Sequence, residues 1–106
     1  MFGGNMQKAM KQVQKMQADM QRLQEEMAEK IVSATAGGGV VEVFVDGHRR
    51  IRDIKISPEV VDPGDIETLQ DLLVAAANEA NRKAEELMNT EMKKITGGMQ
   101  LPPGLF

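Results

Sequence analysis

Basic side chains recur along this chain at spacings that could neutralise the phosphates of a nucleic acid. Lys8, Lys11 and Lys15 are three and four residues apart, so on a helix they form one row. Arg22 continues that side of the helix two turns later. Rows of this kind gain affinity for nucleic acids by releasing the counterions that the phosphates hold. The other candidate contacts are the basic residues of two later segments, which are Arg49, Arg50, Arg52, Lys93 and Lys94.

The charge is distributed unevenly, although the whole chain of 106 residues has a formal net charge of only −3. Residues 1–24 hold four basic residues against Asp19 alone, whereas residues 59–91 hold nine acidic residues against two basic ones. Lysines on an exposed helix usually serve solubility, but a segment without acids in an acidic chain favours a binding face. Because only three residues are aromatic, base stacking is not expected, and the backbone of duplex DNA is the predicted target.

Other kinds of chemistry find little support in the sequence. The chain has no cysteine and a single histidine, so no catalytic residue, metal ligand set or cofactor site is predicted. His48 lies beside a predicted turn and is expected to be a solvated loop residue. The run Gly37-Gly38-Gly39 lacks the pattern of a phosphate-binding loop and precedes a strand rather than a helix. We therefore do not expect an enzyme.

The basic row belongs to a predicted long helix over residues 5–30, which contains no Gly or Pro. Its apolar residues alternate at steps of three and four, which is the pattern of a heptad seam. They are Met6, Ala9, Val13, Met16, Met20, Leu23 and Met27. A seam this long must be buried against another helix.

Three strands are predicted to follow, over residues 31–36, 40–45 and 50–57. Asp46-Gly47 is the signal of a tight hairpin between the last two strands. Ile51 is out of phase with the later isoleucines of its strand, and a bulge near Arg52-Asp53 would correct this.

A second long helix is predicted with Asp62 as its N-cap, Pro63 at its first position and an end near Ile95, where Gly97 and Gly98 stop it. Its apolar face consists of Ile66, Leu69, Leu73, Ala76, Ala77, Ala80, Ala84, Leu87 and Met88. The chain is then a single α+β domain, residues 1–106, of order α-β-β-β-α, with a flexible tail from about residue 97.

Helix and strand lengths together predict a homodimer. The two helices would span roughly 39 and 46 Å, whereas a six-residue strand covers only about 20 Å, so a small sheet cannot cover both apolar faces. The predicted dimer interface consists of Met16, Met20, Leu23, Met27, Leu73, Ala76, Ala77 and Ala80. No secretory signal or membrane-spanning segment is evident, so the expected location is cytoplasmic.

The chain resembles the bacterial YbaB/EbfC family over nearly its whole length. The resemblance is carried by the opening MFGGNMQKAMKQVQKMQADMQRLQEEM, by GGGVVEVFVDG, by IKISPEVVDPGDIETLQDLLVAAANEANRKAEELMNTEM and by the closing GGMQLPPG. It implies a small antiparallel sheet with two long flanking helices, an intertwined homodimer whose helices project like tweezers, and double-stranded DNA binding at the nucleoid that influences nucleoid organisation and gene expression. The projecting helices correspond to those that carry Lys8, Lys11, Lys15, Arg22, Lys93 and Lys94, whereas the hairpin arginines are candidates from charge alone.

The predicted partners are therefore double-stranded DNA and a second copy of the chain, with no membrane and no small-molecule substrate. An alternative belongs to another class of protein: a dimeric scaffold or adaptor that receives a partner helix on its methionine-rich stripe.

Overall fold

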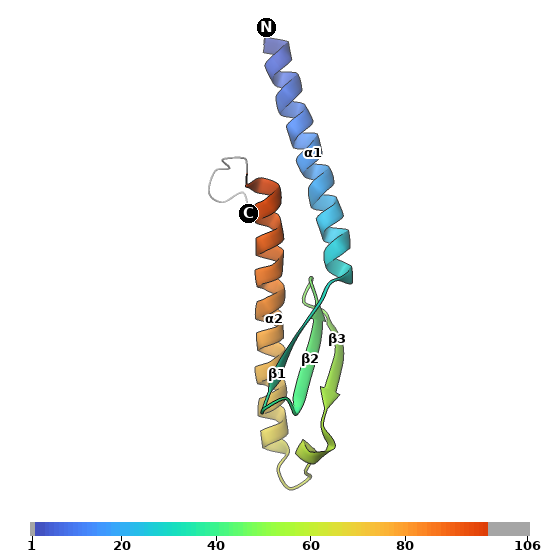
Figure 1. Ribbon diagram of the computed structural model, residues 1–106, viewed down its shortest axis with the longest axis vertical. Coiled ribbons are helices and arrows are strands. Elements are labelled where there is room, and N and C mark those ends of the chain that lie inside the picture. Colours follow the sequence, from blue (N-terminus) through green and yellow to red (C-terminus); the bar gives the residue numbers. More distant parts are fainter. Residues whose placement is uncertain (1, 98–106) are drawn as a thin grey trace.

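The computed structural model describes residues 2–97 of the chain, which form an elongated molecule of 76 × 24 × 16 Å (Figure 1). The predicted order of elements, α-β-β-β-α, is confirmed, and a short 3₁₀ helix is added before the last helix. The elements are α1 (Phe2–Glu29), β1 (Ile31–Ala36), β2 (Val41–Asp46), β3 (Ile51–Ile56), η1 (Pro58–Val60) and α2 (Ile66–Thr96).

Helix α1 buries its apolar seam only at its C-terminal end. Leu23 and Met27 are buried there, where α1 packs on α2 and β2. Toward its N-terminus, α1 extends well past the C-terminal end of α2 (Figure 1). Met6 and Met10 are consequently 63% and 58% exposed, and Val13 is exposed as well. About half of α1 is therefore a free projection from the body of the molecule.

The three strands form an antiparallel sheet of order β1-β2-β3, and α2 packs over β1 and β2. Val41, Val43 and Val45 of β2 are fully buried beneath α2. On the helix, Ala76, Ala80 and Ala84 recur every four residues and are also fully buried. Small side chains in this row let the helix backbone approach the sheet closely.

Strand β3 contains the predicted bulge. Phe44 pairs with Asp53 but Val45 pairs with Ile51, so Arg52 is an extra residue on β3. The bulge brings Ile51 to the same side of the sheet as Ile54 and the buried valines of β2. However, α2 packs mainly on β1 and β2, and every residue of β3 is exposed.

Helix α2 begins three residues later than predicted, so the assignment of Asp62 as N-cap and Pro63 as first helical residue is wrong. Asp62 instead forms a separate turn, in which its carboxylate accepts a hydrogen bond from Gly64 N (2.9 Å) and its carbonyl accepts one from Asp65 N (2.9 Å). Asp65 is the N-cap and accepts from Thr68 N and Thr68 Oγ1. These turn bonds occupy the backbone groups that an earlier helix start would need.

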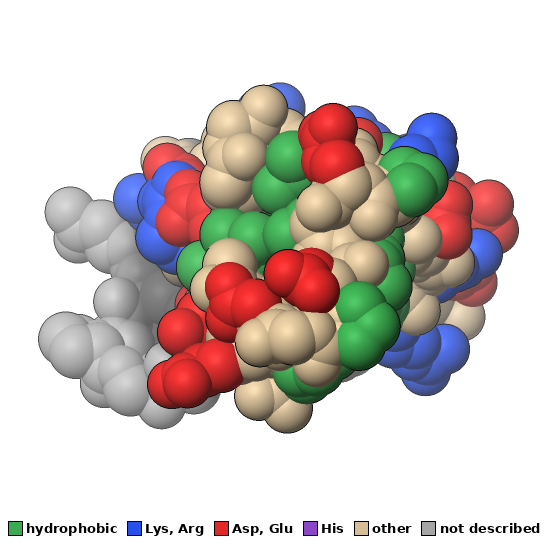
Figure 2. Space-filling model, turned by 90° about the horizontal axis from the view of Figure 1, so that it is seen from below, with side chains coloured by type: hydrophobic (Ala, Val, Ile, Leu, Met, Phe, Trp, Pro, Cys, Tyr) green, Lys and Arg blue, Asp and Glu red, His purple; other side chains and the backbone are tan. Residues whose placement is uncertain are grey.

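At its other end, α2 stops at Gly97, which is the C-cap. Gly98 and the predicted tail lie outside the described residues. The end of the molecule that carries η1 and the start of α2 exposes Val61 and Ile66, and Figure 2 shows hydrophobic side chains there among acidic ones.

Gly37 is the glycine of the β1–β2 turn at which an added side chain would clash with its neighbours. Gly37 and Gly38 both have positive φ, but only a Cβ on Gly37 would meet Val40 and Leu72, at 2.8 and 2.9 Å. We expect Gly38→Ala to cost about 1 kcal/mol through backbone strain and Gly37→Ala to cost roughly 1–3 kcal/mol more through the clash. Urea unfolding of both variants at one protein concentration measures the difference. Equal losses of stability would show that the turn has room for the added methyl group.

Candidate nucleic-acid interface

The predicted lysine row lies on the free half of α1. Lys8, Lys11 and Lys15 are exposed and make no ion pair with any residue in the described part of the chain. At 100° per residue they lie on the side of the helix opposite the apolar seam that includes Met6 and Val13. The row therefore faces away from the side of α1 that packs on the body. We call these three residues the lysine face.

Arg22 and Lys94 are brought near each other, but both have acidic neighbours. They line a cleft of about 210 Å³ between α1 and α2, together with Asp19, Glu26 and Glu91. Arg22 pairs with Asp19, and Lys94 Nζ lies 3.1 Å from Glu91 Oε1. Because these partners offset the positive charges, the cleft is weaker as a phosphate site than the lysine face.

Lys93 is the last of the candidate basic residues on the two long helices and lies at the end of α2. It is exposed and makes no ion pair within residues 2–97. It is a free cation, in contrast to its neighbour Lys94.

The three hairpin arginines differ from one another. Arg49 and Arg50 are exposed, and their side chains have no ion-pair partner among the described residues. Arg52 instead donates from Nη1 to the carbonyl oxygen of Ala28 (3.1 Å) and to Asp46 Oδ2 (3.3 Å). The hairpin meets the C-terminal end of α1, and Lys8 lies about 30 Å farther along that helix. The structure therefore does not bring the hairpin arginines together with the lysine face.

Asp46 is the one buried charged residue in the described core, with 1% of its surface exposed. Its carboxylate accepts hydrogen bonds from His48 N (2.8 Å), Arg50 N (3.1 Å) and the Arg52 guanidinium. Burial raises the pKa of Asp46, but the two backbone N–H donors and Arg52 outweigh it and hold the pKa below its ordinary value. The anion is thus the stable form and orders the β2–β3 turn.

His48 differs from its predicted role as a solvated loop residue. It is half-buried, and its Nε2 lies 2.7 Å from the carbonyl oxygen of Gln24 in α1. Periodicity could not reveal this contact because the two residues are 24 positions apart.

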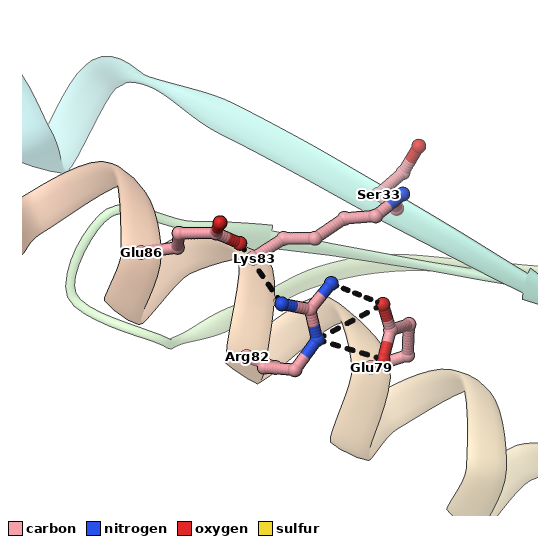
Figure 3. Close-up of polar contacts among 5 residues, drawn as sticks. All are labelled: Ser33, Glu79, Arg82, Lys83 and Glu86. Atoms are coloured by element: carbon pink, nitrogen blue, oxygen red, sulfur yellow. Dashed lines mark hydrogen bonds and ion pairs between the residues drawn. The ribbon is translucent and has the colours of Figure 1, made fainter. Parts of the chain in front are cut away.

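The basic residues in the middle of α2 are occupied by contacts within the chain. Figure 3 shows the Arg82 guanidinium between Glu79 and Glu86, at 2.6 and 2.9 Å, and Lys83 directed toward β1. Lys83 Nζ donates to the carbonyl oxygen of Ser33 (3.0 Å). The hydrogen bonds from Arg82 lower the pKa of Glu79, and Glu79 raises the pKa of Arg82. This part of α2 therefore offers no free cation to DNA and presents mainly acidic groups.

The predicted dimer-interface residues divide into two groups. Leu23, Met27, Ala76 and Ala80 are buried within one chain and have almost no surface left for a second one. The other four, Met16, Met20, Leu73 and Ala77, are half-buried. Conversely, β3 exposes isoleucines that were not predicted as interface residues, although their alternation in the sequence could have indicated an apolar strand face.

Among residues 2–97, no three His, Asp or Glu side chains gather closely enough to hold a metal ion. None of the described helices is long and apolar enough to cross a membrane.

A family model, named relatives and a solved structure match this chain. Residues 2–99 match the model of the YbaB/EbfC DNA-binding family. The chain is 58% identical over 105 residues to a nucleoid-associated protein of Acetivibrio thermocellus, covering 99% of this chain and 93% of that one. It is 54% identical to a nucleoid-associated protein of Pelotomaculum thermopropionicum over all 106 residues of both chains. The crystal structure of the uncharacterized protein HP0035 from Helicobacter pylori superposes with a TM-score of 0.71 at 25% identity, over 80% of this chain and 89% of that one.

Replacing the buried carboxylate should destabilise the protein in a pH-dependent way. Asp46→Asn loses the ionic bond to Arg52, and we expect it to lower the free energy of unfolding at pH 7 by about 1–3 kcal/mol. Because the pKa of Asp46 is lower in the folded state, its stabilisation is present above the ordinary value of 3.8 and is lost as pH falls through the folded-state pKa.

The difference between the parent protein and Asp46→Asn should therefore shrink as pH drops below about 4, in urea titrations at several pH values. Asp53→Asn is the matched control, since Asp53 is exposed and, among residues 2–97, its side chain accepts only from Ile54 N. A stability difference that stays constant from pH 7 to pH 3 would contradict the assigned role of the Asp46 anion.

Proposed function

Because the chain belongs to the YbaB/EbfC DNA-binding family and is a nucleoid-associated DNA-binding protein, we propose that it binds duplex DNA as a homodimer, mainly through phosphate contacts. The observation that carries the proposal is the lysine face, which is exposed, unpaired within the described chain and placed on a projecting helix. Residues 1–18 contain no acidic residue that would weaken the positive electrostatic potential of the lysine face. The bound duplex lies at the nucleoid of the bacterial cytoplasm, and binding there influences nucleoid organisation and gene expression.

Charge segregation explains why the projection, rather than the body, meets the DNA. The middle of α2 presents acidic groups whose basic neighbours are already paired, so this surface repels phosphates. The lysine face attracts them and releases counterions. The mechanism is electrostatic clamping, in which the projecting helices of the dimer present basic rows to the duplex. Recognition of this kind is only weakly selective for sequence, because phosphates are common to all DNA.

Strand β3 supports the homodimer. It is an edge strand with one unpaired row of backbone N–H and C=O groups, which proteins ordinarily cover. Ile51, Ile54 and Ile56 are 55%, 43% and 39% exposed on the side of the sheet that α2 covers elsewhere. One helix, about 10 Å wide, covers only about two strands spaced roughly 4.8 Å apart. A second copy related by a two-fold axis would pair β3 with β3 and bring the isoleucines of both chains together.

The adjoining face of α2 also favours a second copy. Lys83 reaches β1, so the helix face beyond the buried alanines borders β3. That face carries Val74, which is 60% exposed, and Asn81, whose buried Oδ1 has no hydrogen-bond partner within the described chain. A neighbouring subunit could supply both the apolar contact and the missing donor.

One observation favours the alternative scaffold function. The free half of α1 has a shallow depression of about 230 Å³, lined by Ala9, Met10, Val13 and Gln14. Its surface is apolar and adaptable, as is common where a partner helix docks. A protein complex that survives nuclease treatment and is abolished by substitution of Met10 and Val13 would favour this function over DNA binding.

Neutralising the lysine face should weaken binding to all duplexes alike. If a dimer contacts about six phosphates, log K against log[salt] has a slope near −5, and Lys11→Gln with Lys15→Gln should reduce its size by about 1 for each phosphate that is no longer neutralised. Affinity at low salt should fall roughly tenfold or more. Mobility-shift titrations at several salt concentrations measure both quantities.

Gln17→Glu with Gln21→Glu is the matched control, because it changes the net charge equally and neither position is three or four residues from a lysine of the lysine face. The control should retain more affinity than the lysine variant. An identical decrease in both would mean that only net charge matters and that the lysine face does not touch the DNA.

A charge on the apolar side of β3 should separate the subunits. Ile54→Lys places an ammonium group among the isoleucines of the proposed interface, where burial without a partner is costly. We expect the variant to sediment as a folded monomer at micromolar concentration. Thr35→Lys adds the same charge at an exposed residue of β1, at the opposite edge of the sheet, and this variant should remain a dimer. A dimeric Ile54→Lys protein would exclude β3 as the interface.

A further inference from the structure

The end of α1 is fastened to the body by the β2–β3 hairpin. Gly47 N donates to the carbonyl oxygen of Met27 (2.8 Å), Arg52 Nη1 donates to that of Ala28 (3.1 Å), and His48 Nε2 lies 2.7 Å from that of Gln24. Met27 and Ala28 are among the last four residues of α1, whose carbonyls have no partner within the helix and carry partial negative charge. Helix α1 has no basic residue in its own last turn, so Arg52 provides the favourable cation from another element.

Asp46 holds these donors in place through its carboxylate. Its Oδ1 accepts from the backbone N–H groups of His48 and Arg50, which orders the turn. Its Oδ2 accepts from Arg52, which directs the guanidinium toward α1. Arg49 occupies the left-handed region at φ 67°, stabilised by a hydrogen bond from its N–H to the Asp46 carbonyl oxygen (2.9 Å). The hairpin therefore presents a preformed set of donors rather than a flexible loop.

Gly47 and Met27 are in close contact, with no room for a side chain at Gly47. A Cβ on Gly47 would lie 2.7 Å from both Met27 Cβ and Met27 O. Met27 is itself fully buried, so it has little freedom to move away. The contact leaves little room for α1 to tilt about this end.

The free half of α1 has no comparable support among the described residues. The direction of this half of α1 is therefore set near Met27, and the lysine face lies far from that point along the helix. Lys8 is about 29 Å from Met27 along the helix axis, so a tilt of roughly 10° would move it by about 5 Å. That displacement exceeds the rise of about 3.4 Å between phosphates of one strand. We therefore expect small structural changes at the hairpin to alter the affinity for DNA.

We propose that Gly47, His48 and Arg52 are positioning residues that fix the direction of α1 and, through it, the placement of the lysine face on DNA. The expected effect on DNA binding rests on the proposed function, whereas the expected effect on the direction of α1 does not. Arg52, a predicted phosphate contact, acts instead through α1, while the exposed Arg50 two residues earlier has no such role.

The absence of cysteine allows the direction of α1 to be measured directly. Gln12→Cys on α1 and Asn78→Cys on α2 are exposed sites for a pair of spin labels, and labelled chains are diluted with unlabelled chains so that distances within one subunit dominate. Pulsed electron paramagnetic resonance then gives the distance distribution in the whole protein. The variants are Arg52→Gln and His48→Phe, with Arg50→Gln as the control of equal charge change.

We expect Arg52→Gln and His48→Phe to shift or broaden the distance distribution and to weaken DNA binding about three- to tenfold, with the salt slope unchanged. Arg50→Gln should leave the distance distribution as in the parent protein. Circular dichroism confirms that each variant is folded, and His48→Phe serves as the second variant if Arg52→Gln fails to fold.

Three results would overturn the proposal. Unchanged distances in both variants would show that the hairpin does not set the direction of α1. Changed distances with unchanged affinity would show that this direction does not matter for DNA. Unchanged distances with a salt slope reduced by about 1 for each Arg52 would make this residue a phosphate contact. By contrast, full DNA binding by Lys11→Gln with Lys15→Gln would overturn the proposed function while leaving the measured geometry of α1 intact.

Discussion

The contact between the β2–β3 hairpin and the last turns of α1 is the interaction on which the rest of this molecule depends. It joins the projecting helix to the small α/β body, and it does so with backbone groups, one buried carboxylate and one guanidinium. Because Asp46 is buried, its charge is stable only while His48 N, Arg50 N and Arg52 donate to it. The geometry of the turn and the attachment of α1 are thus maintained together.

Periodicity and turn chemistry were sufficient to predict most of the fold. Alternation placed the strands to within one residue, and the phase of Ile51 indicated a bulge near Arg52-Asp53, which the structure places at Arg52. The start of α2 was harder, because Asp62 and Asp65 are both good N-caps and the competing turn at Pro63-Gly64 depends on hydrogen bonds that spacing alone does not show. Local patterns therefore indicated the elements, and hydrogen bonds outside those patterns decided where the helix begins.

The candidate site was less predictable from the sequence. The lysine face follows directly from its spacing, and the structure shows it exposed. Arg22, Lys94 and Arg52 look equally basic in the sequence, yet each has an acidic partner. The roles of Arg52 and His48 depend on residues more than twenty positions away, which no periodicity reveals. Similarly, the seam of α1 correctly indicated burial at Leu23 and Met27, but not that α2 of the same chain would provide it.

The bulge in β3 gives one inserted residue two effects. It rotates Ile51 to the apolar side of the sheet, and it leaves Arg52 outside the regular pairing, where its side chain can reach α1. Removing this single residue would restore a regular ladder and at the same time delete the cation at the helix end. The register of β3 and the attachment of α1 therefore depend on the same residue. An insertion or deletion in this segment would change both together.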